Sequence, residues 1–284
     1  MIPVGFEYER ASSLREVMNA LAKDDGTKLI AGGHSLLPML RFRLAQPAKL
    51  LDIGGVQELK GIDATGRKTK IGSLVTYREL IESAEIAQRF PIIIEAALGI
   101  GDLQVRNLGT VGGGIAHADP ASDMPALMLA LSADLTLRSK GGKRSVPANE
   151  FFQGPFATAM RPDEVLAEIV LPPLPKGAGA AYVSIEQQAS GYAMAGAAAV
   201  VTRSRKTVKT AVVALTGVSD CAYLADVSGV VGTHADQAAL EAATARVTAG
   251  RDVNNDIHAS SEYRAHLAGV VARRAIATAY GRAG

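Results

Sequence analysis

The sequence predicts an α+β fold built from consecutive units, and three observations carry this prediction. Segments with the apolar period of helices alternate along the chain with segments that have the period of strands. Two glycine-rich stretches, at residues 31–36 and 110–114, lie next to predicted helices. A proline cluster over residues 172–175 separates this part from a C-terminal part with its own strands and helices. At 284 residues, the chain is long enough for two or three subdomains.

Composition excludes several classes of function. A net charge of +2 with 20% charged residues gives no basic or acidic surface for nucleic acid. The single cysteine, Cys221, excludes an intramolecular disulfide and a cysteine-held iron–sulfur cluster within this chain. The N-terminus has no apolar core of the kind found in signal peptides, and no stretch is apolar enough for a membrane span. We therefore expect a soluble, cytoplasmic protein with no nucleic-acid partner.

The first predicted unit, residues 1–55, alternates helices and strands. Ser12 or Ser13 caps a helix that Asp24-Asp25-Gly26 ends. The apolar face of this helix consists of Leu14, Val17, Met18 and Leu21. A strand over 28–31 then leads into a glycine turn, followed by a helix over 36–44 and a strand over 49–53. A strand, a glycine turn and a helix start in this order offer backbone N–H groups to a phosphate.

Two further units follow, over residues 56–176 and 177–284. In the first of them, Thr76 and Glu79 have the spacing of a capping box. Its predicted strands are 68–73, 134–139, 143–147 and 165–171, and its predicted helices are 77–83, 91–98 and 123–131. In the C-terminal unit, the predicted strands are 181–186, 195–201 and 208–217, and the predicted helices are 236–247 and 262–280. Tyr263 and Leu267 are expected on one face of the last helix.

The stretch from Thr110 to Asp123 concentrates the chemical signals. Three consecutive glycines after Thr110 predict a tight turn with positive φ and unpaired N–H groups, and Ser122 is the expected N-cap of the next helix. A hairpin or an ordinary loop is the alternative. Neither glycine stretch has the G-x-G-x-x-G or P-loop pattern. Two such stretches from different subdomains would be able to clamp the two phosphates of a dinucleotide.

The segments AGGHSLLPMLRFRLAQPAKLLDI and TVGGGIAHADPASDMPAL closely resemble the two flavin-binding segments of the FAD-carrying medium subunits of molybdenum hydroxylases. That family includes the medium subunit of aerobic carbon monoxide dehydrogenase and the FAD domain of xanthine dehydrogenase. The resemblance covers essentially the whole chain. It implies a fold of the vanillyl-alcohol-oxidase (PCMH) type, with FAD-binding subdomains at 1–55 and 56–176. A C-terminal α+β domain with a small antiparallel sheet is implied for 177–284.

The resemblance also implies an electron relay and no substrate site on this chain. A large subunit would oxidise substrate at a molybdenum–pterin centre, and a small subunit with [2Fe-2S] clusters would pass electrons to FAD on this chain. FAD would then reduce an external acceptor (quinone, NAD or oxygen), in a dimer of heterotrimers. Relatives oxidise carbon monoxide, purines, N-heterocycles or aldehydes, so no substrate is predicted. Two alternatives are a self-sufficient FAD-dependent reductase or oxidase and a non-catalytic nucleotide-binding module.

The resemblance implies sixteen FAD-binding residues, no catalytic residue and no metal ligand. They are Ile30, Ala31, Gly32, Gly33, His34, Ser35, Leu36, Leu37, Thr110, Val111, Gly112, Gly113, Gly114, Asp123, Leu166 and Tyr192. The residues of 32–35 would donate amides to the pyrophosphate, and Asp123 would bond a ribose or ribityl hydroxyl. Tyr192 would shield one flavin face. On residue type alone, His34 is a capping or core histidine, Asp123 a helix first-turn carboxylate and Tyr192 a packing residue.

Three positions depart from the family pattern. Gly114 replaces an Asn, Glu186 stands where many relatives have Lys, and Ser190-Gly191 replaces Gly-Asp. We expect these changes to affect the potential and the electron acceptor of the flavin, and to leave the phosphate contacts intact. His117 and Asp119 are too few and too scattered to predict a metal site.

Overall fold

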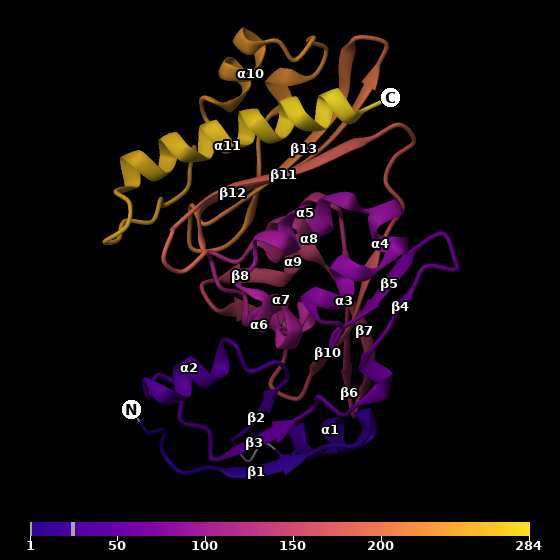
Figure 1. Ribbon diagram of the computed structural model, residues 1–284, viewed down its shortest axis with the longest axis vertical. Coiled ribbons are helices and arrows are strands. Elements are labelled where there is room, and N and C mark those ends of the chain that lie inside the picture. The colour runs from indigo at the N-terminus through magenta and orange to yellow at the C-terminus, as the bar shows by residue number, and fades with distance from the viewer. Residues whose placement is uncertain (1, 24–25) are drawn as a thin grey trace.

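The computed structural model places three main sheets one after another along the long axis of the molecule (Figure 1). It describes residues 2–23 and 26–284, so the helix break predicted at Asp24-Asp25 lies outside the described residues. Among the helices of the described residues, none is both long and apolar enough to cross a membrane.

The N-terminal unit is a parallel sheet in the order β1-β3-β2 with two helices. Ser13 caps the first helix by accepting a hydrogen bond from the Glu16 amide, as the sequence allows. The first strand was not predicted, because its sequence EYER has no apolar face and all four residues are exposed. The elements are β1 (Glu7–Arg10), α1 (Leu14–Leu21), β2 (Thr27–Ile30), α2 (Leu36–Arg41) and β3 (Lys49–Asp52).

The middle unit is an antiparallel sheet in the order β4-β5-β10-β6-β7, covered by helices. The capping box predicted at Thr76 and Glu79 forms at the start of α3. The strands are β4 (Ile62–Asp63), β5 (Thr69–Gly72), β6 (Asp134–Ser139), β7 (Gly142–Pro147) and β10 (Val165–Leu171), with a separate hairpin of β8 (Phe152–Gly154) and β9 (Ala157–Thr158). The helices are α3 (Tyr77–Glu82), α4 (Ala84–Arg89), α5 (Pro91–Gly99), α6 (Leu103–Leu108), α7 (Val111–His117), α8 (Asp123–Ala130) and α9 (Ala148–Phe151), after a short 3₁₀ turn at Gln57–Leu59.

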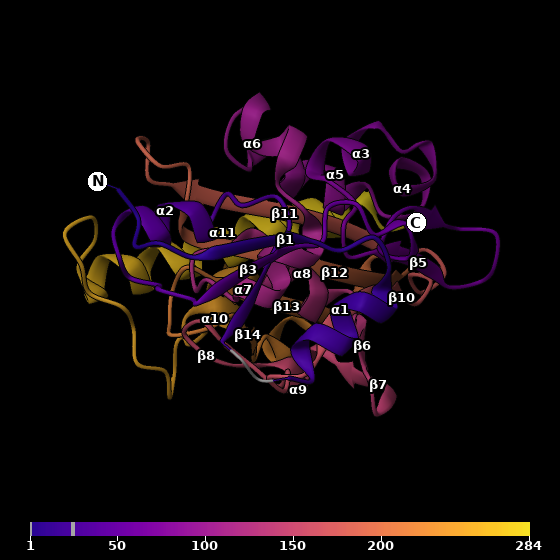
Figure 2. The same cartoon turned by 90° about the horizontal axis from the view of Figure 1, so that it is seen from below.

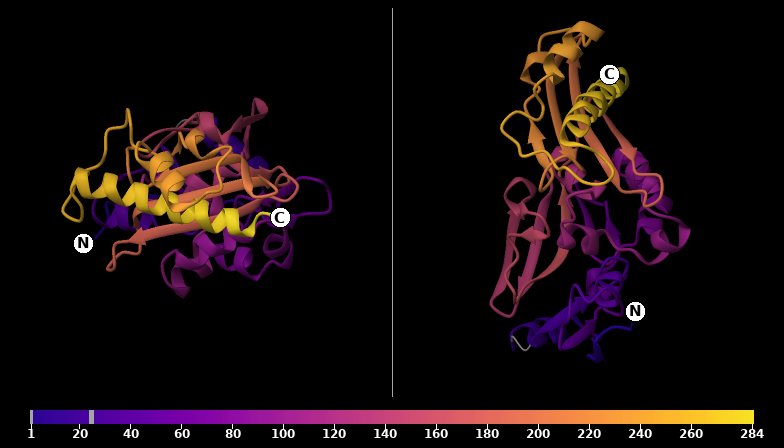
Figure 3. Two further views of the ribbon diagram at one scale, coloured as in Figure 1. Left: turned by 90° about the horizontal axis from the view of Figure 1, so that it is seen from above. Right: turned by 90° about the vertical axis from the view of Figure 1, so that its left-hand side faces the viewer.

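The C-terminal unit is an antiparallel sheet whose strands follow chain order. One face packs on α11 and the other on α5 and α8 (Figure 3). Because both faces of the sheet are covered, the strand β12 (Ala193–Ser204) is almost wholly buried, and its many Ala residues allow the layers on both sides to pack closely. The elements are β11 (Gly179–Glu186), β12 (Ala193–Ser204), β13 (Thr207–Thr216), β14 (Tyr223–Ala225), a 3₁₀ turn at Ser228–Val230, α10 (Gln237–Thr244) and α11 (Ser261–Arg282).

Two expectations are corrected. The three glycines 112–114, expected to form a tight turn with positive φ, lie in the helix α7, and none of them has positive φ. The physical reason is that Thr110 caps this helix and that its glycines pack closely against neighbouring segments. Tyr263 is 49% exposed and does not share the buried face of Leu267 on α11.

Candidate cofactor site

A cleft of about 930 Å³ lies where the loop between β2 and α2 faces helices α7 and α8. Seen from below, the N-terminal strands cross in front of these two helices (Figure 2). The cleft is lined by every predicted site residue except Leu37 and Val111. Leu37 is exposed on α2, whereas Val111 is buried in the middle core. Tertiary folding therefore brings together two glycine stretches that are far apart in the sequence.

The loop before α2 supplies free backbone donors. The amides of Gly32, Gly33, His34 and Ser35 donate no hydrogen bond to other described residues. Gly33 has a φ of +72°, which an L side chain rarely adopts. Ser35 caps α2 without using its hydroxyl, and His34 Nδ1 lies 2.7 Å from the Gly32 carbonyl oxygen. Four free donors in one loop at a helix start form a cradle for an anion such as a diphosphate.

The second glycine stretch contributes a close-packed surface and few donors. Thr110 Oγ1 accepts a hydrogen bond from the Gly113 amide, and the Val111 amide donates to the Val75 carbonyl. The Gly112 amide donates to the Ser73 carbonyl, so the predicted unpaired amides of this stretch are already satisfied. A Cβ on Gly112 would lie 2.6 Å from the Ser73 Cα. Backbone approaches Gly112, whereas the Thr110 and Tyr77 side chains approach Gly113 and Gly114, so there is no room for a Cβ at any of the three.

Ser73 lines the cleft and has a hydroxyl group without a hydrogen-bond partner among the described residues. Its side chain is buried. Such a hydroxyl costs free energy unless a ligand supplies the partner. Lys28 and Arg161 line the same cleft and carry positive charge. An FAD molecule, with a diphosphate and several sugar and ribityl hydroxyls, has the groups that these residues would satisfy.

Asp123 lies in the first turn of α8 and is 9% exposed. Its Oδ1 accepts a hydrogen bond from the Tyr182 hydroxyl of β11. Burial raises the pKa of Asp123 to about 6, the Tyr182 hydrogen bond opposes this shift, and the nearby charge of Glu186 adds to it. Desolvation, followed by the charge of Asp123, raises the pKa of Tyr182. The cleft therefore contains a buried carboxyl group with no cationic partner among the described residues.

Two other predicted residues lie at different depths. Leu166 is a buried residue of β10, next to a bulge in its pairing with β6. Tyr192 lies at the end of the β11–β12 turn and is 44% exposed, so it is not a packed core residue. Burial, with the charges of Asp119 and Asp123, raises the pKa of the Tyr192 hydroxyl. Its ring lines the cleft and is free to cover a bound planar group.

The structure accounts for the three departures from the family pattern. The Tyr77 hydroxyl occupies the position where a side chain at Gly114 would begin. Glu186 is exposed, and its Oε1 accepts a hydrogen bond of 2.9 Å from Ser184. Ser190 Oγ accepts from the Tyr192 amide at 3.3 Å, and Gly191 has a φ of +73° that explains a glycine in this turn. The Tyr77 side chain therefore fills the space beside Gly114.

Several lining residues were not predicted from the sequence. Ser73 lies just before an ordinary capped helix and Tyr77 begins it, so neither lining residue carries a sequence signal of its own. Tyr182, which bonds Asp123, is likewise one residue of a regular strand. His117 contacts the Phe156 ring with centroids 5.0 Å apart, and burial lowers its pKa. Among the described residues, no group of three or more His, Cys, Asp or Glu side chains is arranged to hold a metal ion.

Two protein families together match most of the chain. Residues 4–174 match the family described as "FAD binding domain in molybdopterin dehydrogenase", and residues 180–279 match "CO dehydrogenase flavoprotein C-terminal domain". The chain is 40% identical over 286 residues to the carbon monoxide dehydrogenase medium chain of Afipia carboxidovorans. That match covers 100% of this chain and 99% of the relative.

Solved structures have the same fold over the whole chain. A chain of carbon monoxide dehydrogenase from Hydrogenophaga pseudoflava superposes with a TM-score of 0.96 at 38% identity, covering 100% of both chains. A chain of quinoline 2-oxidoreductase from Pseudomonas putida 86 superposes with a TM-score of 0.94 at 32% identity, covering 99% of both. The chain therefore belongs to the family of FAD-binding medium subunits of molybdenum hydroxylases, which are subunits of oxidoreductase complexes.

Proposed function

We propose that FAD binds in the 930 Å³ cleft and that this chain passes electrons from iron–sulfur clusters of a partner subunit to an external acceptor. The observation that carries the proposal is that the free amides of Gly32–Ser35 and the orphaned hydroxyl of Ser73 line one cleft. Bound FAD would supply a redox centre that accepts and releases electrons. The chain itself would bind, orient and shield this group.

Each part of the cleft has a role in this proposal. The amides of 32–35 bind the pyrophosphate, while Lys28 and Arg161 offset its charge. Asp123 accepts a hydrogen bond from a ribose or ribityl hydroxyl, held in place by Tyr182. Tyr192 covers one face of the flavin and excludes water from it. The FAD-binding subdomains are 1–55 and 56–176, and 177–284 is the C-terminal domain.

The partners follow from the same proposal. A large molybdenum–pterin subunit oxidises the substrate, and a small [2Fe-2S] subunit delivers electrons, in a cytoplasmic dimer of heterotrimers. The acceptor is a quinone, NAD or oxygen. The relatives with this fold include a carbon monoxide dehydrogenase and a quinoline 2-oxidoreductase, which supports placing substrate choice on another subunit.

The test is purification of the complex that contains this chain from its native cells, followed by a visible spectrum and metal analysis. We expect flavin absorbance together with iron and molybdenum, and flavin reduction after iron–sulfur reduction in rapid mixing with substrate. A lone chain with FAD that turns over a reductant would instead support the self-sufficient flavoenzyme. A bound nucleotide without redox turnover would support a non-catalytic binding module.

A further inference from the structure

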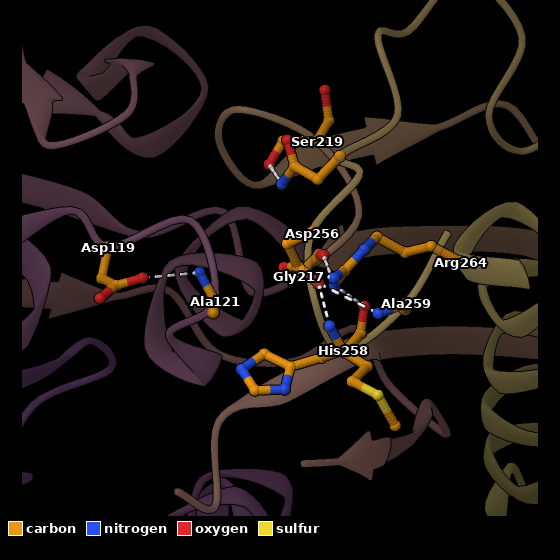
Figure 4. Close-up of polar contacts among 10 residues, drawn as sticks. Asp119, Ala121, Gly217, Ser219, Asp256, His258, Ala259 and Arg264 are labelled. Atoms are coloured by element: carbon orange, nitrogen blue, oxygen red, sulfur yellow. Dashed lines mark hydrogen bonds and ion pairs between the residues drawn. The ribbon is translucent and has the colours of Figure 1, made fainter. Parts of the chain in front are cut away.

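Arg264 is a buried cation of α11 whose contacts are mainly to backbone. Its side chain is 4% exposed, and Nη1 donates hydrogen bonds of 2.8 Å to the carbonyls of both Met194 and Gly217. Nη2 forms an ion pair of 2.7 Å with Asp256, whereas Nε has no partner among the described residues. Figure 4 shows Arg264 with Gly217 and Asp256 beside the Asp119–Ala121 turn. Burying a guanidinium without hydrogen bonds has a large cost in free energy. The buried Arg264 therefore favours conformations in which the Met194 and Gly217 carbonyls stay bonded to it.

The Met194 carbonyl follows a turn that lines the cofactor cleft, whereas the Gly217 carbonyl lies at the end of β13, which bonds a second lining segment. Met194 lies two residues after Tyr192, at the start of β12. The Gly217 amide donates to the Pro120 carbonyl at 2.8 Å. Next to it, the buried Thr216 hydroxyl bonds the carbonyls of Pro120 at 3.0 Å and Ser122 at 2.6 Å. The segment 120–122 leads directly into Asp123, so one guanidinium contacts both the Tyr192 strand and the strand that holds the Asp123 loop.

Gly217 makes this junction tight. Its φ is +76°, and a Cβ there would overlap the Ala193 carbonyl oxygen. The end of β13 therefore lies directly against the residue that follows Tyr192. Only a glycine permits this approach. Arg264 donates a hydrogen bond to the carbonyl of this same glycine.

The segment 254–259, which precedes α11, fixes the position of the acid that pairs with Arg264. The Asn254 side chain donates a hydrogen bond to the Ser219 carbonyl at 2.8 Å, and the Asn254 backbone N–H donates to the Val218 carbonyl at 2.9 Å. Asp256 Oδ1 accepts from the amides of His258 and Ala259, which leaves Oδ2 for Arg264. The carboxylate is therefore fixed before it pairs with the guanidinium.

We propose that Arg264 is a positioning residue for the flavin, acting through backbone. By holding the Met194 and Gly217 carbonyls, it sets the spacing between Tyr192 and the loop that presents Asp123. The inference rests on the proposed FAD site. The C-terminal helix α11 does not line the cleft, and in this proposal it influences the shape of the cleft through the backbone that Arg264 holds.

The experiment uses the full-length chain and compares Arg264→Lys and Asp256→Asn with Arg273→Lys. Arg273 is the control, since it also lies on α11 and pairs with an acid (Glu241, 3.4 Å), and neither residue of this pair lines the cleft. Lys keeps the charge of Arg but loses its forked geometry. We expect both Arg264→Lys and Asp256→Asn to raise the Kd for FAD about tenfold, with less than about twofold for Arg273→Lys.

The visible circular dichroism of bound FAD separates positioning from stability. We expect it to change in the Arg264 and Asp256 variants and to stay the same in Arg273→Lys. Asp256 has a side chain that is 46% exposed, so its Asn variant tests the idea even where Arg264→Lys fails to fold. Equal FAD affinity and dichroism in all three variants would overturn the inference alone. Failure of the wild-type chain to bind FAD would overturn the proposed function and this inference with it.

Discussion

At the scale of single residues, the cleft contains polar groups that the folded chain does not satisfy by itself. Asp123 is a buried carboxyl group with one hydrogen bond, from Tyr182. Ser73 is a buried hydroxyl with no partner among the described residues. Both groups cost stability in the chain without ligand, and both gain partners if FAD binds as proposed. The residue-scale predictions use this opposition between stability and binding.

The first prediction concerns pH and Asp123→Asn. The pKa of Asp123 is raised to about 6, so its contribution to stability is fully present below its unfolded pKa and is lost as pH rises through about 6. The cost at pH 7 is on the order of 3 kcal/mol, at about 1.4 kcal/mol per pKa unit. We expect Asp123→Asn to remove the fall in stability between about pH 4 and pH 6. Denaturant unfolding of the FAD-free chain across this range measures it, and an unchanged pH profile would contradict the assignment.

The second prediction is a pair of opposite effects in Ser73→Ala. Without FAD, removal of the unsatisfied hydroxyl is expected to stabilise the chain by about 1 kcal/mol. With FAD, the same change is expected to weaken binding about fivefold if the hydroxyl bonds the cofactor. Thermal unfolding and fluorescence titration measure the two effects. Ser145→Ala on the outer strand β7 is the control, and stabilisation without any loss of affinity would place FAD away from Ser73.

At the scale of elements, α7 shows how tertiary contacts overrule local propensity. Three glycines in a row disfavour a helix, and the sequence alone predicts a turn. The helix forms because Thr110 caps it and because Ser73 and Tyr77 pack where side chains would otherwise stand. Its glycines therefore serve close packing rather than an unusual backbone conformation.

The third prediction compares two glycines that both lie in helices. Gly281→Ala on α11 meets nothing within 4 Å, so we expect a gain of about 0.5–1 kcal/mol from helix propensity. Gly112→Ala on α7 would place a Cβ 2.6 Å from the Ser73 Cα and carbonyl oxygen. We expect it to lose roughly 2 kcal/mol or more and to displace the cleft wall. Denaturant unfolding of the two variants gives the comparison, and a gain at both positions would contradict the packing argument.

At the scale of the whole molecule, the three units differ in how much apolar core they share with one another. The C-terminal sheet contributes Ala198 and Val200 to the core of the middle unit, while its other face packs on α11. The N-terminal unit has a separate apolar cluster, which it shares with middle-unit residues in the 3₁₀ turn and near β5 and β10, such as Leu59, Leu74 and Val165. The proposed FAD site spans the boundary between this unit and the middle unit.

The fourth prediction follows from that arrangement and tests the proposed division at residue 55. Without FAD, amide hydrogen exchange is expected to be faster in β2 and β3 than in β12. At FAD concentrations of about 100 times Kd, binding adds about 2.7 kcal/mol to the stability of the bound form, so protection of β2 and β3 is expected to rise most. Uniform protection in all strands, with no selective change on adding FAD, would indicate a single cooperative unit.

The sequence by itself determined the elements whose signals are local. Apolar periodicity and capping residues predicted α1, α3, α8 and the long strands, and the structure confirms them to within a few residues. The same kind of signal placed the free amides of 32–35 at a helix start. It was silent on β1, which has no apolar face. Local signals suffice where a segment's own side chains fix its backbone and its buried face.

The tertiary structure alone decided which residues share the cleft. Ser73 and Tyr77 line it after β5 and at the start of α3, and Tyr182 of β11 bonds its Asp123. Arg264 holds its loops from a helix at the other end of the chain. It also decided that residues 111–117 form a helix. Each of these outcomes depends on contacts between residues far apart in the sequence, and no local pattern encodes such contacts.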